Sequence, residues 1–325
     1  MQSTVHQTII ICGSSRAGKT TLAKLTCKYS NSHNGLIFEG LFPAYLSRLS
    51  YVLKRYHPKL FDEYLERPRF IDEGKSKTLA PIEQLDERDY SYKGSFMSSL
   101  HYAFGENWVI ADLHAELYYK ALLRALPNIY FCVVIRDPRD CVCAGLYWQD
   151  YPNARKNRKS WFYKRLFSWI LSAHIAEEIK QNHPENISVI NFNQIKNNET
   201  AKQLLGLKEG WDKDLPEHAY YSFIGEGQFT TPDKEGKVLE LLTVKERAII
   251  QNLCADMMQK YGYAPENLPS VNIATLKIVK TMVIAIAKLS PSLARGFIDL
   301  LFSPVQHARK QLERLKQLIK DIKNF

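Results

Sequence analysis

The residues best suited to do chemistry lie near the start of the chain, where four residues separate Gly13 from Gly18-Lys19-Thr20. Gly-x-x-x-x-Gly-Lys-Thr is the complete pattern of a phosphate-binding (Walker A) loop. Its glycines let the backbone wrap closely around a phosphate, and its lysine adds a positive charge. An apolar, β-branched run at residues 8–12 precedes the loop, and apolar residues beginning with Leu22 follow it. We therefore expect a strand, a phosphate-binding loop and a helix whose N-terminus faces a bound anion.

Other polar side chains come directly after apolar runs that predict strands. They are Glu39 after residues 36–38, Asp112 and His114 after residues 108–111, and Arg136 after residues 129–135. Ligands of parallel sheets bind at the carboxyl ends of the strands, so we expect these side chains near the phosphate-binding loop.

Strand patterns alternate with helical patterns through most of the chain, with a last strand expected at residues 187–192. This alternation predicts an α/β fold, a three-layer P-loop nucleotide-binding fold with a central, mostly parallel sheet. Residues 41–100 are expected to form helices and loops over the site. We predict a domain of residues 1–265 followed by a helical extension of residues 266–325.

Composition excludes several classes of protein. Of the 325 residues, 45% are hydrophobic and 12% aromatic, which is enough for a packed core and excludes global disorder. The six cysteines have no metal-ligand spacing, so we expect reduced thiols and no metal site. A signal peptide is not apparent, and the uncharged apolar stretch 281–287 is too short to cross a bilayer. We therefore expect a cytoplasmic protein.

Positive charge is concentrated at the C-terminal end of the chain. The formal net charge is +10, and residues 270–325 hold ten basic and three acidic side chains, which leaves +7 there. Apolar residues recur at heptad spacing in the last segment: Val305, Ala308, Leu312, Leu315, Ile319 and Ile322. Such a seam could pack on the body, pair two chains or lie on an acidic membrane. A nucleic-acid partner is not expected.

Residues 130–140, which end in Arg136-Asp137-Pro138-Arg139-Asp140, resemble a strand and turn of sulfotransferases that use 3′-phosphoadenosine 5′-phosphosulfate (PAPS). Three other stretches resemble this family in the same order, so that the resemblance covers about residues 7–265. They are residues 15–22, like its phosphosulfate loop, residues 188–195, like its late strand, and residues 242–263, like its closing helix and Gly-Tyr ending.

The resemblance implies roles for individual residues. Arg136 would contact the 3′-phosphate, and Lys234 and Lys237 lie in a segment similar to one that closes on the same phosphate. The family has a serine at the position of Ala144, so one phosphate ligand is missing here. The residues expected to hold the 5′-phosphosulfate are Ser15, Arg16, Ala17, Gly18, Lys19, Thr20 and Thr21.

Two residues are candidates for the general base that deprotonates an acceptor hydroxyl or amine. Some family members carry a glutamate where Glu39 stands, and others a histidine where His114 stands. We prefer Glu39. Lys19 would stabilise the charge of the leaving nucleotide. The acceptor is expected to be a small molecule, a glycan or a lipid.

Two alternatives remain open at this point. Lys19 stands where the family usually has threonine, and Asp112 follows an apolar run, as does the aspartate that holds Mg²⁺ in many kinases. An ATP- or GTP-dependent kinase would place Thr20 and Asp112 on Mg²⁺. The other alternative is a degenerate nucleotide-binding module without catalysis.

Overall fold

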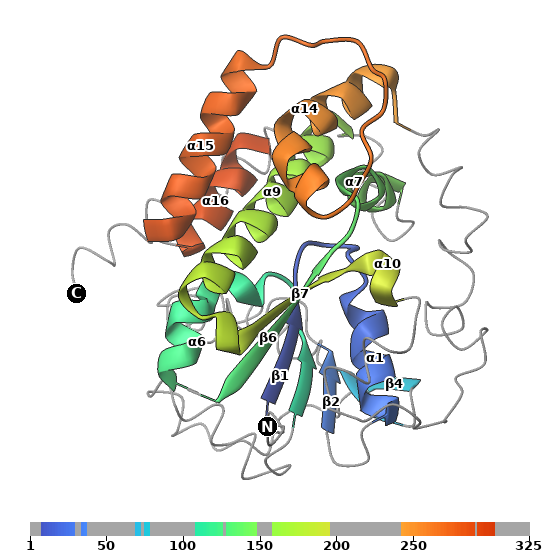
Figure 1. Ribbon diagram of the computed structural model, residues 1–325, viewed down its shortest axis with the longest axis vertical. Helices are drawn as coiled ribbons and strands as arrows, with labels where there is room; N and C mark the ends of the chain where they lie inside the picture. Colours follow the sequence, from blue (N-terminus) through green and yellow to red (C-terminus); the bar gives the residue numbers. More distant parts are fainter. Residues whose placement is uncertain are drawn as a thin grey trace. The chain divides into compact units, whose positions relative to one another are not determined.

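The computed structural model describes residues 8–29, 34–37, 69–72, 75–78, 108–125, 128–147, 158–195, 242–289 and 291–302 (Figure 1). The chain divides into two compact units. The first unit comprises Met1–Gly13, Gly18–Val134 and Glu178–Phe223, and the second comprises Ser14–Ala17, Ile135–Glu177 and Ile224–Phe325. The predicted boundary between residues 265 and 266 stays a prediction.

The described part of the first unit is built on a seven-stranded sheet with the order β4-β3-β2-β5-β1-β6-β7. Its strands are β1 (Thr8–Cys12), β2 (Asn34–Ile37), β3 (Arg69–Asp72), β4 (Lys75–Thr78), β5 (Trp108–Ala111), β6 (Ile129–Ile135) and β7 (Ile187–Asn191). β1 runs parallel to β5 and β6, and β5 runs parallel to β2. β3 and β4 are antiparallel additions at one edge. The predicted α/β fold with a mostly parallel sheet is confirmed.

The central strands form because their sequences are apolar without interruption. Every residue of β1 is buried, and Ile10 lies opposite Ile110 of β5 and Phe131 of β6. Strands covered on both faces favour such continuous, β-branched runs. The expectation of only helices and loops within residues 41–100 was wrong, because β3 and β4 lie in this range.

Helices of the first unit connect these strands. α1 (Lys19–Tyr29) follows the loop after β1 and packs against β1, β2 and β5. The short 3₁₀ helix η2 (Ala115–Tyr118) and α6 (Tyr119–Ala125) follow β5. The 3₁₀ helix η3 (Pro184–Asn186) precedes β7, and α10 (Phe192–Ile195) follows it. The loop after β1 thus leads directly into a helix, as predicted.

The described part of the second unit is helical. It contains α7 (Pro138–Tyr147), α9 (Arg158–Asn182) as far as Glu177, α14 (Val244–Lys260), α15 (Ala274–Leu289) and α16 (Pro291–Phe302). α14 packs against α7 and α15, and α15 lies beside α16 (Figure 1).

Local sequence fixes the ends of these helices. Thr243 and Glu246 form a reciprocal capping box at the start of α14. Proline is the first residue of α7 and of α16, where a missing N–H costs nothing.

The predicted helical extension is confirmed for α15 and α16, whereas the apolar seam between Val305 and Ile322 lies outside the described residues. Among the helices that the structure describes, none is long and apolar enough to cross a membrane.

Candidate functional site

The backbone between β1 and α1 has the dihedral angles of an anion-binding loop. Three residues have positive φ: Gly13 (129°), Arg16 (66°) and Gly18 (102°). Residues of positive and negative φ in alternation turn successive amides toward one concavity, which suits an anion. The Gly18 carbonyl accepts the first hydrogen bond of α1 from the Leu22 amide, so the helix begins directly at the loop. The strand, loop and helix occur in the predicted order, and phosphate binding by the loop stays a prediction.

Both glycines of the motif are required by packing as well as by dihedral angle. A Cβ atom on Gly13 would lie 2.6 Å from the carbonyl oxygen of Val134. A Cβ atom on Gly18 would lie 2.5 Å from the ring of Phe192. The loop therefore packs against the sheet and against the start of α10 more closely than any other residue type would permit.

A buried carboxylate that the motifs do not indicate binds the first glycine of the loop. Glu116 is fully buried, and its Oε2 accepts the Gly13 amide at 3.0 Å. Its Oε1 lies 3.2 Å from Nδ1 of His114. The His114 amide donates to the Gly13 carbonyl at 3.3 Å, and His114 itself has a positive φ of 62°. His114 and Glu116 thus hold both polar groups of the Gly13 backbone.

The same carboxylate affects the thiol that ends β1. Burial, and after it the charge of Glu116, raises the pKa of Cys12 well above its usual value. Cys12 therefore stays a neutral thiol in the core and is not a nucleophile.

Asp112 lies at the carboxyl end of β5, as predicted, and is fully buried. Its Oδ1 accepts the amide of the next residue, Leu113, at 2.7 Å. Its own amide donates to the Ile11 carbonyl at 3.0 Å. The bond from the Asp112 amide continues the β1–β5 ladder by one residue.

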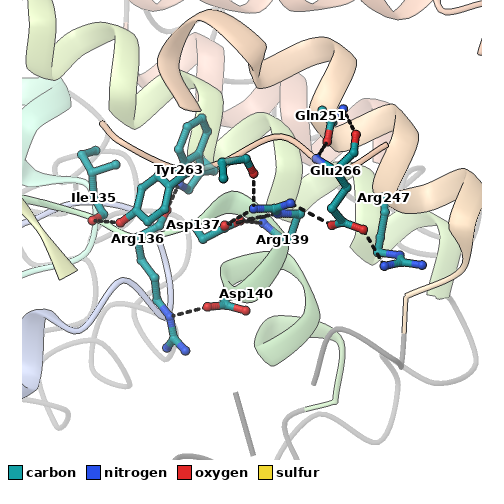
Figure 2. A network of polar contacts seen from close by, with 11 residues as sticks. Ile135, Arg136, Asp137, Arg139, Asp140, Arg247, Gln251, Tyr263 and Glu266 are labelled. Atoms are coloured by element: carbon teal, nitrogen blue, oxygen red, sulfur yellow. Dashed lines mark hydrogen bonds and ion pairs between the residues drawn. The ribbon is translucent and has the colours of Figure 1, made fainter. Parts of the chain in front are cut away.

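In the second unit, Arg136 lies against a residue of the phosphate-binding loop. The Arg136 side chain is almost completely buried, and its Nη1 donates a long hydrogen bond, 3.5 Å, to the carbonyl of Arg16. Its Nε lies 3.5 Å from a carboxylate oxygen of Asp140, one helical turn later (Figure 2). The structure thus brings together two of the arginines that the sequence placed at a phosphate.

The backbone that carries Arg136 is held by two aromatic side chains. The indole Nε1 of Trp169 donates to the Arg136 carbonyl at 2.8 Å. The hydroxyl of Tyr263 donates to the Ile135 carbonyl at 2.9 Å (Figure 2). Both carbonyl oxygens are buried away from water, and these hydrogen bonds take the place of bonds to water. They therefore stabilise the turn after β6.

Arg139, the second arginine of the turn, has a different environment. It donates to Asp137 at 2.6 Å, to Glu266 at 2.8 Å and to the Ala264 carbonyl at 2.9 Å (Figure 2). The other oxygen of Glu266 accepts from Arg247 at 2.6 Å. Burial lowers the pKa of Arg139, but hydrogen bonds and charge from the two carboxylates outweigh burial and raise it. Arg139 is therefore a structural residue that joins α7 to the segment after α14.

The predicted site residues fall into three groups. Residues 15–21 form the loop and the first turn of α1, with Thr21 buried and Thr20 exposed. His114 contacts Gly13 within the first unit, and Arg136 contacts Arg16 within the second. Glu39, Lys234 and Lys237 lie outside the described residues, and their roles stay predictions.

Comparisons with known proteins give a limited result. No protein-family model and no curated protein matches the chain. A crystal structure of sulfotransferase STF9 from Mycobacterium avium matches with 11% identity and a TM-score of 0.47, over 82% of this chain and 79% of that one. The sulfotransferase domain from the Synechococcus PCC 7002 olefin synthase matches with 10% identity and a TM-score of 0.40, over 71% of this chain and 92% of that one. Both identities are below 25%, and both TM-scores are below 0.5.

Proposed function

We propose that this protein transfers a sulfuryl group from PAPS to an acceptor hydroxyl or amine. The observation that carries the proposal is the position of Arg136. A buried guanidinium beside the backbone of the phosphate-binding loop suits a second phosphate on the nucleotide, because a guanidinium binds a phosphate with two parallel hydrogen bonds. An ATP site has no 3′-phosphate that would require such a group.

The two arginines of the turn have different surroundings. Arg139 binds two carboxylates and a carbonyl at 2.6–2.9 Å, which suits a structural cation. The atoms of Arg136 lie 3.5 Å from both of the partners described above, and its backbone is fixed by Trp169.

The remaining roles follow from the chemistry of the residues present. PAPS, when bound, would supply the sulfuryl group and leave as adenosine 3′,5′-bisphosphate. The alternating dihedral angles of the loop and the N-terminus of α1 suit the 5′-phosphosulfate. Lys19, at the start of α1, would stabilise the charge that develops on the leaving phosphate.

A general base must take the proton of the acceptor. His114 suits this task because its Nδ1 lies 3.2 Å from Oε1 of Glu116, and in the tautomer that donates from Nδ1 to this carboxylate, Nε2 would be the basic nitrogen. Glu39 remains the other candidate. The acceptor class, a small molecule, glycan or lipid, is part of the proposal.

Calorimetric titration tests the donor site most directly. We expect adenosine 3′,5′-bisphosphate to bind without Mg²⁺ and more tightly than adenosine 5′-phosphate. Arg136→Ala should lower the affinity for the bisphosphate about 100-fold, since one charge-assisted, bidentate contact is worth roughly 3 kcal/mol. Its affinity for the 5′-phosphate should change little. Arg247→Ala is the matched control, because it removes a different arginine of the same unit, the one that donates to Glu266. This variant should keep the preference for the 3′-phosphate.

Three outcomes would contradict the proposal. Arg136→Ala with an undiminished preference for the 3′-phosphate would remove Arg136 from the donor site. Mg²⁺-dependent binding of ATP, with no preference for a 3′-phosphate, would favour the kinase alternative. Tight bisphosphate binding with no transfer from PAPS to any acceptor would favour the non-catalytic alternative.

A further inference from the structure

We infer that α15 binds the surface of an anionic lipid membrane through an apolar stripe on its exposed side. The stripe consists of Ile278, Met282, Ala285 and Leu289, which follow one another at spacings of four, three and four residues. This spacing places them on one face of the helix. Ile278 is 62% exposed, Met282 46% and Leu289 89%. This inference is independent of the proposed catalytic function.

The stripe is not the face by which α15 packs on the protein. Val283 and Ala287 are buried, and they lie on the opposite side of the helix at its 100° per residue. Lys280 also belongs to the packed side, where its ammonium group donates to the Leu253 carbonyl at 2.6 Å. α15 is therefore apolar on two sides, and of these two sides the one with Val283 and Ala287 is buried by the part of the chain that the structure describes.

The charges beside the stripe are positive. Lys277 and Lys288 lie along one edge of it, separated by Thr281, and both lysines are exposed. The helix contains no acidic residue, as its sequence ATLKIVKTMVIAIAKL shows. Leu301, near the end of the neighbouring helix α16, is a further exposed apolar side chain. An apolar stripe edged by lysines is typical of helices that lie in the plane of a membrane.

Charge also favours a membrane over the two other partners that could cover the stripe, which are residues 303–325 and a second copy of the protein. Residues 303–325 contain six basic and two acidic side chains, which gives this segment a net charge of +4. Packing of this segment on the stripe would bring like charges together at the Lys277 edge, and pairing of α15 with a second copy would do the same. An anionic bilayer offers negative headgroups for the lysines and acyl chains for the stripe.

Vesicle flotation with the full chain tests the inference. We expect binding to vesicles of phosphatidylcholine with phosphatidylserine, weaker binding in high salt, and little binding to phosphatidylcholine alone. The triple variant Ile278→Ser/Met282→Ser/Leu289→Ser should bind at least about tenfold more weakly. Val244→Ser, an equally apolar residue that is 50% exposed at the start of α14, is the control and should change binding less than about twofold.

A charge reversal gives a second, independent readout. Lys277→Glu should weaken binding at least about fivefold, since one lysine near an anionic surface accounts for roughly that factor. Lys245→Glu reverses an exposed lysine on α14 instead and should have the smaller effect.

Three results would overturn the inference. The first is equal binding to neutral and anionic vesicles, or no binding to either. The second is a solution mass of two chains that falls to one chain in the triple variant, which would assign the stripe to a second copy. The third concerns Met282→Cys carrying an environment-sensitive fluorophore. Its emission should shift to the blue only when anionic vesicles are added, and a blue-shifted emission already present without vesicles would mean that the chain itself covers the stripe.

Discussion

Removal of the Glu116 carboxylate should destabilise the protein strongly, because two buried groups depend on it. The Gly13 amide donates to it at 3.0 Å and the His114 ring contacts it at 3.2 Å, while the carboxylate itself is fully buried. A hydrogen bond to a charged group contributes about 1.5–3 kcal/mol, and the two together give about 3–6 kcal/mol. We expect Glu116→Ala to lower the free energy of unfolding by this amount.

Glu116→Gln separates the structural from the chemical role of this side chain. The amide has the same shape and keeps one accepting oxygen, which must face the Gly13 amide because the NH₂ group would oppose it. The NH₂ group then faces Nδ1 of His114, so the ring must carry its proton on Nε2 instead. The loss of stability should be only about 1–2 kcal/mol. If His114 is the base of the proposed reaction, turnover should fall by about 100-fold or more while nucleotide affinity stays unchanged.

The assays are urea denaturation followed by circular dichroism, and turnover with PAPS. Glu178→Gln provides the control, because Glu178 is a half-buried carboxylate that accepts from Tyr119 at 2.9 Å, away from the loop. It should cost less than about 1 kcal/mol. A Glu116→Ala protein within about 0.5 kcal/mol of the wild type would refute the reasoning, since surface substitutions alone give effects of that size. Unchanged turnover in Glu116→Gln would remove His114 from the role of base.

Three further predictions concern stability. Arg139→Met should lower the free energy of unfolding by about 2–4 kcal/mol, because Asp137 would stay half-buried without its cation, and an unchanged urea midpoint would contradict this. Burial, and after it the charges of two lysines on α15, lowers the pKa of His174 from 6.5 to about 4. Protonation therefore favours the unfolded chain, and stability should fall by about 1–2 kcal/mol as the pH drops from 6.5 to 4. His174→Phe should flatten this part of the pH profile, and an equally steep profile in the variant would show that other groups cause it. Gly13→Ala should cost several times more stability than Gly262→Ala. The Cβ added at position 13 would lie 2.6 Å from a carbonyl oxygen, whereas a Cβ at Gly262, with a φ of 75°, would meet open space. Equal losses of stability would mean that dihedral strain alone matters.

The central strands could be predicted from the sequence because burial on both faces leaves a continuous apolar run. The predicted limits of β1 and β6 coincide with those observed, Thr8–Cys12 and Ile129–Ile135. β4 could not be found in this way. Its sequence, Lys-Ser-Lys-Thr, contains no apolar residue, and its pairing with β3 is decided by backbone hydrogen bonds at the sheet edge.

The site could be predicted as far as local motifs extend. The spacing of Gly13 and Gly18 and the run into Arg136 indicate their positions directly. Glu116 has no such signal, because a glutamate within a helical pattern is usually exposed and only the packing of η2 against β1 buries it. Its one local indication is that it follows His114 by two residues.

The different roles of Arg136 and Arg139 also depend on residues far away in the sequence. Both belong to the same five-residue turn, and the sequence distinguishes them only by the place of Arg136 directly after the predicted strand. Tyr263 and Glu266, more than 120 residues later, bind the Ile135 carbonyl and the Arg139 guanidinium respectively. The segment after α14 thus holds the turn on both sides of Arg136. Arg139 receives a carboxylate from far along the chain, Glu266, whereas the carboxylate beside Arg136, Asp140, belongs to the same turn. The sequence near the turn can therefore indicate the ion pair of Arg136 with Asp140, but it cannot indicate the one of Arg139 with Glu266.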